Sequence, residues 1–276
     1  MSKERIDILL VQNGLFITRE KAKAAIMAGI VYIDNERIDK PGEKVDVTKE
    51  IIVKGNTHPY VGRGGLKLEK ALDVFQINLT GKTMIDIGAS TGGFTDCALQ
   101  NGARHVYAVD VGYGQLDWKL RSDSRVTVLE RTNFRYLEVD KLDDELPEIA
   151  TIDVSFISLK IIFPKLAEIL KPNGYVVALI KPQFEAGKES VGKKGIVRDA
   201  KVHKQVLHDV IQNIITHQFT LQGLTYSPIT GGDGNIEFLA VFKFEPTSLK
   251  EGDEILNELE LNSKIDDVIQ AAHNNL

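Results

Sequence analysis

Residues 86–99 of this 276-residue chain, DIGASTGGFTDCAL, carry its strongest local signal for a fold. It continues the apolar run TMI, so we predict a strand that ends at Gly88 and a helix that begins near Gly93. The small residues between them let the backbone approach a ligand closely, and the helix start offers free N–H groups. The stretch therefore predicts a ligand-binding turn at the carboxyl end of a strand.

The ligand expected at this turn is a sulfonium compound rather than a dinucleotide. Ser90 and Thr91 follow Ala89, which fits the pattern G-x-G-x-x-G poorly. Asp86 puts a carboxylate where a pyrophosphate would sit, whereas an ammonium group suits it, and Asp110 ends the next predicted strand, where an acidic residue binds ribose hydroxyls. A tight turn without a ligand is the alternative. We predict S-adenosylmethionine as cofactor, with contacts from Asp86, Gly88, Ala89, Ser90, Gly92, Gly93, Phe94, Asp110 and Asp153.

Strand-like apolar runs alternate with amphipathic helical patterns from residue 61 to residue 244. The candidate strands are TMIDIG, HVYAVDV, VTVLE, IATIDVSF, YVVALIK, FTLQGLTYS and IEFLAVFKF. The alternation predicts an α/β fold with a Rossmann-like, mostly parallel, doubly wound sheet. The connection SPITGGDGN is too short for a parallel crossover, so the last strand is predicted to be antiparallel.

Residues 1–54 predict a separate, small α+β module. RIDILL and REKAKAAIMAG have helical spacing, with Gly14 as C-cap of the first helix and Thr18 as N-cap of the second. IVYID reads as a strand, and NERIDKPGEKVD as turns around a return strand. We expect residues 55–60 to be a linker and residues 245–276 to be an acidic tail with a weak helical pattern.

Composition and charge restrict the class of protein. Hydrophobic residues make up 43% and charged residues 26%, as in soluble globular proteins. The tail has eight acidic and two basic residues, so the net charge of −5 belongs to the tail and the rest is nearly neutral. We find no long apolar run and no secretory signal, and we expect a cytoplasmic protein without stable membrane association. The single cysteine, Cys97, excludes an internal disulfide and a multi-cysteine metal site.

Charged residues stand at the ends of several predicted strands. Lys181 follows the apolar run VVALI, Asp153 follows ATI, and Glu237 opens the last strand. Lys67 begins a predicted helix that leads into the first strand. Because open α/β sheets bind their ligands at the carboxyl ends of the strands, we expect these four side chains to converge on one pocket.

The chain resembles the TlyA (hemolysin A) family of ribosomal RNA methyltransferases, which are FtsJ-like 2′-O-methyltransferases. The motifs that carry the resemblance are DIGASTGGFT, DVSFIS, LIKPQFE, GNIEFL and YVGRGGLKLEKAL. Residues 1–54 resemble the alpha-L type RNA-binding domain through RIDILL, TREKAKAAI, IVYID and KPG. The resemblance implies S-adenosylmethionine-dependent methylation of a ribose 2′-hydroxyl in ribosomal RNA, on a cytidine.

The resemblance also implies the roles of four catalytic residues. Lys181 is the expected proton acceptor and Asp153 orients it, while Lys67 and Glu237 hold the ribose and support the lysines. A lysine has an ordinary pKa of about 10.4; burial lowers such a pKa, and a nearby carboxylate raises it. Alignment of the hydroxyl is expected to supply much of the rate, and no metal is needed.

The expected partner is ribosomal RNA or a ribosomal subunit, and not DNA, which lacks the 2′-hydroxyl. The candidates for contacts with RNA are Arg5, Arg19, Lys21, Lys23, Arg37, Lys40, Arg63, Lys188, Lys193 and Lys194. The last three lie, with Arg198, in EAGKESVGKKGIVRD, a long glycine-rich segment that we predict to be a lid.

Three alternatives remain at the level of sequence. A base methyltransferase acting on carbon 5 would need a cysteine nucleophile, but Cys97 is expected to pack inside a helix; one acting on an amino group would favour a Pro-aromatic motif where this chain has DVSF. A non-catalytic ribosome-assembly factor would need only the N-terminal module. A membrane-active hemolysin is suggested by the family name alone.

Overall fold

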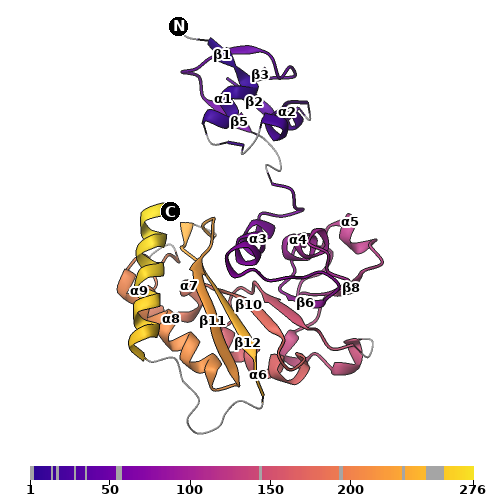
Figure 1. Cartoon of the computed structure of the whole chain (residues 1–276), viewed down its shortest axis with the longest axis vertical. Helices are drawn as coiled ribbons and strands as arrows, with labels where there is room; N and C mark the ends of the chain where they lie inside the picture. Colours follow the sequence, from indigo (N-terminus) through magenta and orange to yellow (C-terminus); the bar gives the residue numbers. More distant parts are fainter. Residues whose placement is uncertain are drawn as a thin grey trace. The chain divides into compact units, whose positions relative to one another are not determined.

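The computed structural model describes residues 3–13, 15–16, 19–27, 29–34, 36–53, 58–142, 145–192, 195–231, 234–246 and 258–276, without the side chains of Lys21, Ala24 and Lys188. The chain divides into two compact units, Met1–Pro59 and Tyr60–Leu276 (Figure 1).

Among its described residues, the first unit contains two helices and two small sheets. Its elements are β1 (Lys3–Arg5), α1 (Ile6–Gln12), α2 (Arg19–Met27), β2 (Val31–Ile33), β3 (Glu36–Arg37), β4 (Lys44–Asp46) and β5 (Ile51–Val53). β1 pairs with β4, and β2 pairs with β3 and β5, all antiparallel. The predicted α+β module is confirmed. The sequence pattern does not indicate β1 and β5, because three residues are too few to reveal an alternation of period two.

One apolar core joins the helices of this unit to its sheets. In α1, Ile6, Leu9 and Leu10 are spaced so that they share one face, and all three are buried. The other buried members of this core are Phe16, Ala22, Ala25, Ile26, Val31, Ile33, Ile38 and Val45. The predicted caps Gly14 and Thr18 lie outside the described residues.

The second unit is built on a seven-stranded sheet with the order β11-β12-β10-β9-β6-β7-β8 (Figure 1). Its strands are β6 (Thr83–Ile87), β7 (His105–Val109), β8 (Val126–Leu129), β9 (Ile149–Ile152), β10 (Tyr175–Ile180), β11 (Phe219–Tyr226) and β12 (Phe238–Phe244). The first five are parallel, and β12 is antiparallel to both β10 and β11. The predicted mostly parallel sheet with an antiparallel last strand is confirmed.

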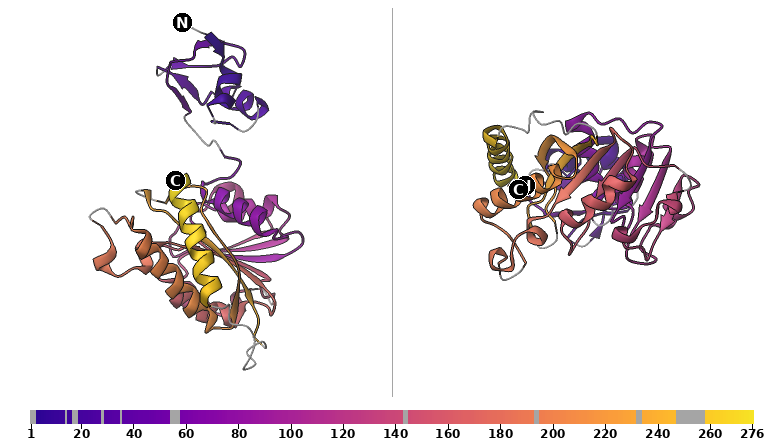
Figure 2. Two further views of the ribbon diagram at one scale, coloured as in Figure 1. Left: turned by 60° about the vertical axis from the view of Figure 1, so that its left-hand side comes forward. Right: turned by 90° about the horizontal axis from the view of Figure 1, so that it is seen from below.

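Helices cover both faces of this sheet (Figure 2). Alternate side chains of each strand point to opposite faces, and apolar side chains on both faces are buried under the helices. In β6, Met84 packs in the core on one face and Ile85 in the core on the other. The first core includes α3 (Gly64–Phe75), α4 (Gly93–Gln100) and α5 (Trp118–Arg121). The second includes α6 (Leu159–Ile169), α8 (Ala200–Ile215) and α9 (Glu258–Asn275). The short helices are α7 (Pro182–Glu185), η1 (Phe134–Tyr136), η2 (Val139–Leu142) and η3 (Lys188–Ser190).

Helix α9, in the acidic tail, packs against α8 and β11 (Figure 2). Leu261, Ile265, Ile269 and Ala272 recur every three or four residues, and all four are buried in the core beneath the helix. The acidic side chains Glu258, Glu260, Asp266 and Asp267 are exposed. The described part of the tail is therefore an amphipathic helix that belongs to the second unit.

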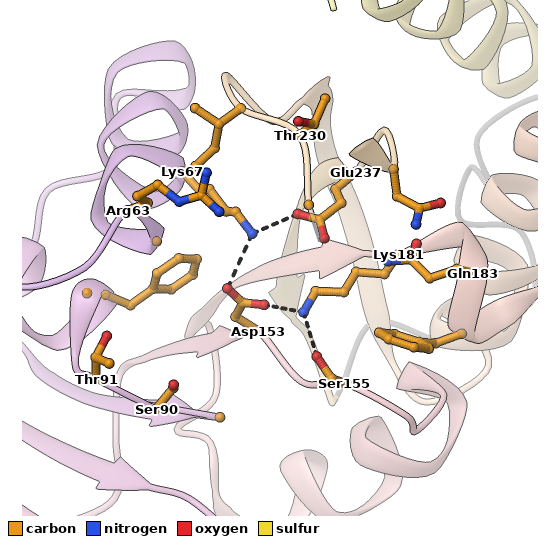
Figure 3. Close-up of a pocket in the computed structure, with 18 of the residues that line it drawn as sticks. Arg63, Lys67, Ser90, Thr91, Asp153, Ser155, Lys181, Gln183, Thr230 and Glu237 are labelled. Atoms are coloured by element: carbon orange, nitrogen blue, oxygen red, sulfur yellow. Dashed lines mark hydrogen bonds and ion pairs between the residues drawn. The ribbon is translucent and has the colours of Figure 1, made fainter. Parts of the chain in front are cut away.

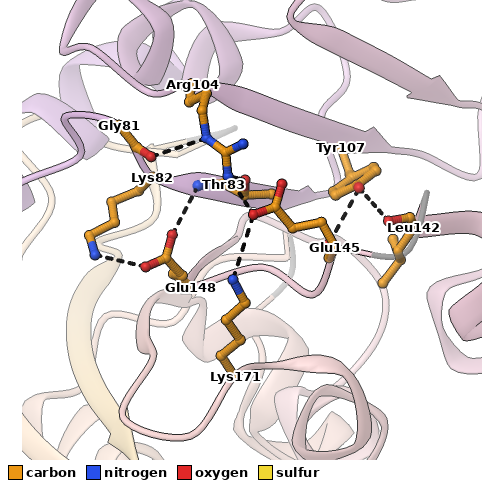
Figure 4. A network of polar contacts seen from close by, with 9 residues as sticks. All are labelled: Gly81, Lys82, Thr83, Arg104, Tyr107, Leu142, Glu145, Glu148 and Lys171. Carbon is orange, nitrogen blue, oxygen red and sulfur yellow. Dashed lines mark hydrogen bonds and ion pairs between the residues drawn. The ribbon is translucent and has the colours of Figure 1, made fainter.

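A polar network joins the segments at the amino ends of the central strands β6, β7 and β9 (Figure 4). Glu148 accepts a hydrogen bond of 2.7 Å from Lys82 Nζ and a longer one from the backbone N–H of Thr83. Arg104 donates to Thr83 Oγ1 at 2.9 Å and pairs with Glu145. These contacts hold the start of β6 against the segments before β7 and β9.

Candidate active site

The second unit brings the predicted site residues to one edge of its sheet. Four of them directly follow the last residue of a parallel strand: Gly88, Asp110, Asp153 and Lys181. Glu237 directly precedes β12, and the antiparallel register sets Phe238 opposite Ile180 of β10. Glu237 therefore lies at the same edge, next to the carboxyl end of β10.

Four charged side chains meet at this edge (Figure 3). Lys181 Nζ lies 2.5 Å from Oδ1 of Asp153, and Lys67 Nζ lies 3.6 Å from Oδ2 of the same carboxylate. Lys67 Nζ also donates a hydrogen bond of 2.7 Å to Oε2 of Glu237. The four side chains that we expected to converge thus form one connected group, in which Asp153 bridges the two lysines.

This group is largely removed from solvent. The side chains of Lys67 and Lys181 are each 9% exposed, that of Glu237 is 3% exposed, and that of Asp153 is 19% exposed. A buried charge is costly unless it is paired, and here two ammonium groups balance two carboxylates. The pairing holds both lysine side chains in fixed positions.

Sequence reasoning missed two residues that join the loop after β9 to the segment after β10. Ser155 Oγ lies 3.1 Å from Lys181 Nζ, which donates to it. Glu185 accepts hydrogen bonds from Ser158 Oγ at 2.6 Å and from the backbone N–H of Leu159 at 2.8 Å. Burial raises the pKa of Glu185. Ser155 lies in the motif DVSFIS and Glu185 lies in the motif LIKPQFE. Membership in these two motifs was the signal that could have identified them as site residues.

The charged group faces a cavity of about 590 Å³. Of the predicted residues, the cavity is lined by Arg63, Lys67, Gly88, Ala89, Ser90, Gly93, Phe94, Asp153, Lys181 and Glu237. The other lining residues are Gly64, Thr91, Ser155, Phe156, Gln183, Phe184, Gly195, Ile229, Thr230, Gly231 and Asn235. Phe156 is 90% exposed and its backbone has φ +64°, a conformation that L residues rarely adopt. An exposed ring in a strained backbone indicates a functional position rather than a packing role.

A second cavity of about 370 Å³ adjoins the first, since Gly88, Ser90, Asp153, Ser155 and Phe156 line both. Its remaining walls are Ile87, Val109, Asp110, Val111, Gln115, Thr132, Asn133, Phe134, Val154, Ile157 and Ile162. The carboxylate of Asp110 suits the hydroxyl groups of a ribose, and the apolar walls suit an adenine ring. The residues present therefore fit the adenosine part of S-adenosylmethionine.

The walls at Thr132, Asn133 and Phe134 come from the segment after β8, which we did not assign to the site. The rule that ligands bind at the carboxyl ends of the strands could have indicated this segment.

Two glycines of the turn are required by packing. Gly88 has φ +88°, and a side chain there would collide with the carbonyl group of Asp153. Gly92 has φ +96°, and a side chain there would collide with Leu116 and Leu120. Gly88 still borders both cavities, whereas Gly92 lines neither.

Asp86 is not where we expected it. Its side chain is completely buried and lines neither cavity; it accepts hydrogen bonds from Thr95 Oγ1 at 2.7 Å and Thr151 Oγ1 at 3.0 Å. Burial raises the pKa of Asp86 to about 6, against the two hydroxyl hydrogen bonds. The reason is that β6 is buried on both faces, so a carboxylate inside the strand points into the protein. In this structure Asp86 supports the turn from beneath.

Cys97 is completely buried in α4. Burial raises the pKa of its thiol to about 12, so hardly any thiolate forms at neutral pH. It also lines neither cavity. These observations disfavour a cysteine-dependent base methyltransferase.

Two predicted RNA-contact residues of the first unit share one buried partner. Arg5 Nε lies 3.0 Å and Arg19 Nη2 lies 2.8 Å from the carboxylate of Asp7, whose side chain is fully buried. These arginines hold the pKa of Asp7 well below its usual range. Arg5 and Arg19 therefore tie β1 and α2 to α1, and both keep more than a third of their side chains exposed.

The remaining RNA candidates differ in surroundings. Arg37 pairs with Asp39 at 2.8 Å, Lys40 is exposed and Lys23 is half-buried. Arg63 is exposed at the 590 Å³ cavity. The side chains of Lys21 and Lys188, and residues Lys193 and Lys194, lie outside the described residues.

The predicted lid segment is anchored beside the cavity. Asn235, which is 3% exposed, accepts a hydrogen bond from the backbone N–H of Val197 and donates one to the carbonyl of Gly195, both at 3.0 Å. Gly195 lines the cavity. The described part of the segment is thus held to the strand-end motif GNIEFL.

Across the described residues, none of the helices combines the length and apolar character needed to cross a membrane.

The sheet order and the strand-end cavities define a Rossmann-like methyltransferase. Residues 60–244 match the FtsJ-like methyltransferase family and residues 4–51 match the S4 domain. The chain belongs to the FtsJ-like methyltransferase family. The prediction of an S-adenosylmethionine-dependent enzyme is therefore confirmed at the level of class.

Relatives over most of the chain bear out the resemblance to TlyA and hemolysin A. YqxC of Bacillus subtilis (strain 168), which is named as an rRNA methyltransferase, is 58% identical, and the match covers 99% of this chain and 95% of the YqxC chain. The 16S/23S rRNA (cytidine-2′-O)-methyltransferase TlyA of Mycobacterium tuberculosis is 40% identical over 86% of this chain and 88% of its own. A solved structure from Streptococcus thermophilus is 52% identical, with a TM-score of 0.75, and covers 100% of this chain and 97% of that one.

Proposed function

We propose that this protein methylates the 2′-hydroxyl of a ribose in ribosomal RNA, on a cytidine, with S-adenosylmethionine as methyl donor. The observation that carries the proposal is the buried group of Lys67, Asp153, Lys181 and Glu237 at the edge of the larger cavity. A ribose hydroxyl needs a proton acceptor and firm alignment, and this group provides both. The name of the mycobacterial relative supports the substrate.

In this proposal Lys181 takes the hydroxyl proton while Asp153 holds its amino group. Bound S-adenosylmethionine supplies an electrophilic methyl group and the positive charge of its sulfonium. Lys67, held by Glu237, faces the same cavity and is suited to donate a hydrogen bond to the ribose.

RNA recognition in this proposal falls to the first unit and to residues near the cavities. The S4 domain match supports the first unit as an RNA-binding module. Arg5, Arg19 and Lys40 carry exposed positive charge there and are suited to phosphate contacts. Phe156 exposes its ring at the larger cavity, where an unstacked base could rest on it.

The product distinguishes this function from methylation of a base. The purified enzyme is incubated with labelled S-adenosylmethionine and with ribosomal subunits that lack the modification, and the labelled nucleosides are identified by mass spectrometry. We expect 2′-O-methylcytidine. A label on a nucleobase would contradict ribose methylation, and an enzyme that binds cofactor but labels neither subunit would contradict the ribosomal substrate.

A further inference from the structure

Lys181 has a second oxygen neighbour besides the carboxylate of Asp153. Its Nζ lies 2.5 Å from Asp153 Oδ1 and 3.1 Å from Ser155 Oγ. Figure 3 shows both contacts leaving the nitrogen toward the loop that follows β9. All three residues line the larger cavity, so a ligand bound there would lie beside the side chain of Lys181.

The geometry of an amine explains why two oxygen neighbours matter. A lysine that accepts a proton must first be neutral, with two N–H bonds and one lone pair on a tetrahedral nitrogen. If Asp153 and Ser155 accept the two N–H bonds, the lone pair occupies the one direction that is left. With Asp153 alone, rotation about the Cε–Nζ bond could turn an N–H bond toward the cavity instead.

We propose that Ser155 is a positioning residue that directs the lone pair of Lys181 toward the ribose 2′-hydroxyl. This inference rests on the proposed function. In the transfer step, the 2′-oxygen forms a bond to the methyl carbon, and the carbon–sulfur bond breaks with its electron pair going to sulfur. The hydroxyl proton moves to Nζ of Lys181, which becomes an ammonium group held by the same two oxygens.

Contacts around the loop keep Ser155 at this distance from Lys181. Glu185, four residues after Lys181, accepts hydrogen bonds from Ser158 Oγ and from the N–H of Leu159. The rings of Phe156 and Phe184 lie 4.9 Å apart between the same two segments. Beyond the Ser155–Lys181 contact, the two segments are thus joined at two further places.

Helix capping does not explain Ser155. Ser158 caps α6, because its Oγ accepts the hydrogen bond from the N–H of Lys160 at 3.2 Å. Ser155 lies three residues earlier and is exposed to the cavity. A serine that only filled space there would not need its hydroxyl group.

Two substitutions of equal shape isolate that hydroxyl. Threonine and valine have side chains of nearly the same shape as each other. Ser155→Thr keeps the hydroxyl group, whereas Ser155→Val has a methyl group in its place. We would measure the single-turnover rate of methyl transfer to unmodified ribosomal subunits at saturating cofactor and RNA, and the affinity for S-adenosylhomocysteine by calorimetry. We expect Ser155→Val to be about 10- to 100-fold slower than wild type, since the contact is part of a proton transfer. Ser155→Thr should stay within about threefold of wild type, and both variants should bind S-adenosylhomocysteine within about threefold.

Several results would overturn the inference. They are a valine variant as fast as wild type, a threonine variant as slow as the valine variant, and a loss of cofactor affinity that matches the loss of rate. The wild-type product separates this failure from failure of the proposed function. A wild-type enzyme that does not methylate ribose contradicts the proposed function, and the inference about Ser155 falls with it.

Discussion

Asp86 lies completely buried between the hydroxyl groups of Thr95 and Thr151, and its ionised form is costly there. Burial raises the pKa of Asp86 from 3.8 to about 6. A raised pKa means that the folded protein binds the proton more tightly than the unfolded chain does. The resulting stability is present in full below about pH 4 and is lost as the pH rises through 6.

We therefore expect Asp86→Asn to become more stable relative to wild type as the pH rises from 4 to 7, by about 3 kcal/mol at most. Thermal and urea unfolding across this range would measure the difference. Asp96→Asn is the control, because Asp96 is also buried in this region but has a cation, Lys119 Nζ at 3.1 Å, and should lose stability instead. A constant difference between Asp86→Asn and wild type would contradict the account of Asp86.

At the scale of elements, α9 shows how an acidic segment can still stabilise the fold. Ile265 is completely buried against the second core, whereas Asp267 on the same helix is exposed. We expect Ile265→Ala to lower the free energy of unfolding by about 2–5 kcal/mol and Asp267→Ala to change it by less than about 0.5 kcal/mol. Urea unfolding of the three proteins measures this. Equal effects of the two substitutions would mean that α9 does not pack as described.

The elements also explain how much the sequence could reveal. The seven strands of the second unit were predictable, because each is an apolar run bounded by turn residues. The short connection before β12 indicated that this strand is antiparallel to β11, but its pairing with β10, which sets Glu237 near Lys181, could not be read from that connection. The partners of Asp86 were not predictable, since Thr95 and Thr151 come from different elements. The contact between Ser155 and Lys181 likewise joins positions 26 residues apart and depends on two loop conformations.

At the scale of the whole molecule, two units with separate cores support separate tasks. The core of Met1–Pro59 has no member from the second unit among the described residues, and both cavities are lined only by residues beyond Pro59. We expect deletion of residues 1–59 to weaken binding of ribosomal RNA by at least about tenfold, because phosphate contacts are lost. Affinity for S-adenosylhomocysteine should change by less than about threefold.

Fluorescence anisotropy with RNA and calorimetry with S-adenosylhomocysteine would measure the two affinities of the truncated protein. Truncated protein that methylates ribosomal subunits as fast as the full chain at limiting RNA would rule out an RNA-binding role for the first unit.

The role of Lys181 as proton acceptor is tested by the rate of methyl transfer by Lys181→Met, compared with wild type on the same ribosomal subunits. Methionine keeps an unbranched side chain that ends where the Cε atom of lysine lies and lacks the amino group, so the proton acceptor is lost while most of the cavity wall remains. We predict a single-turnover rate at least about 100-fold lower, with the affinity for S-adenosylhomocysteine within about threefold of wild type. A variant that forms 2′-O-methylcytidine at the wild-type rate would contradict the assignment of Lys181 as the proton acceptor.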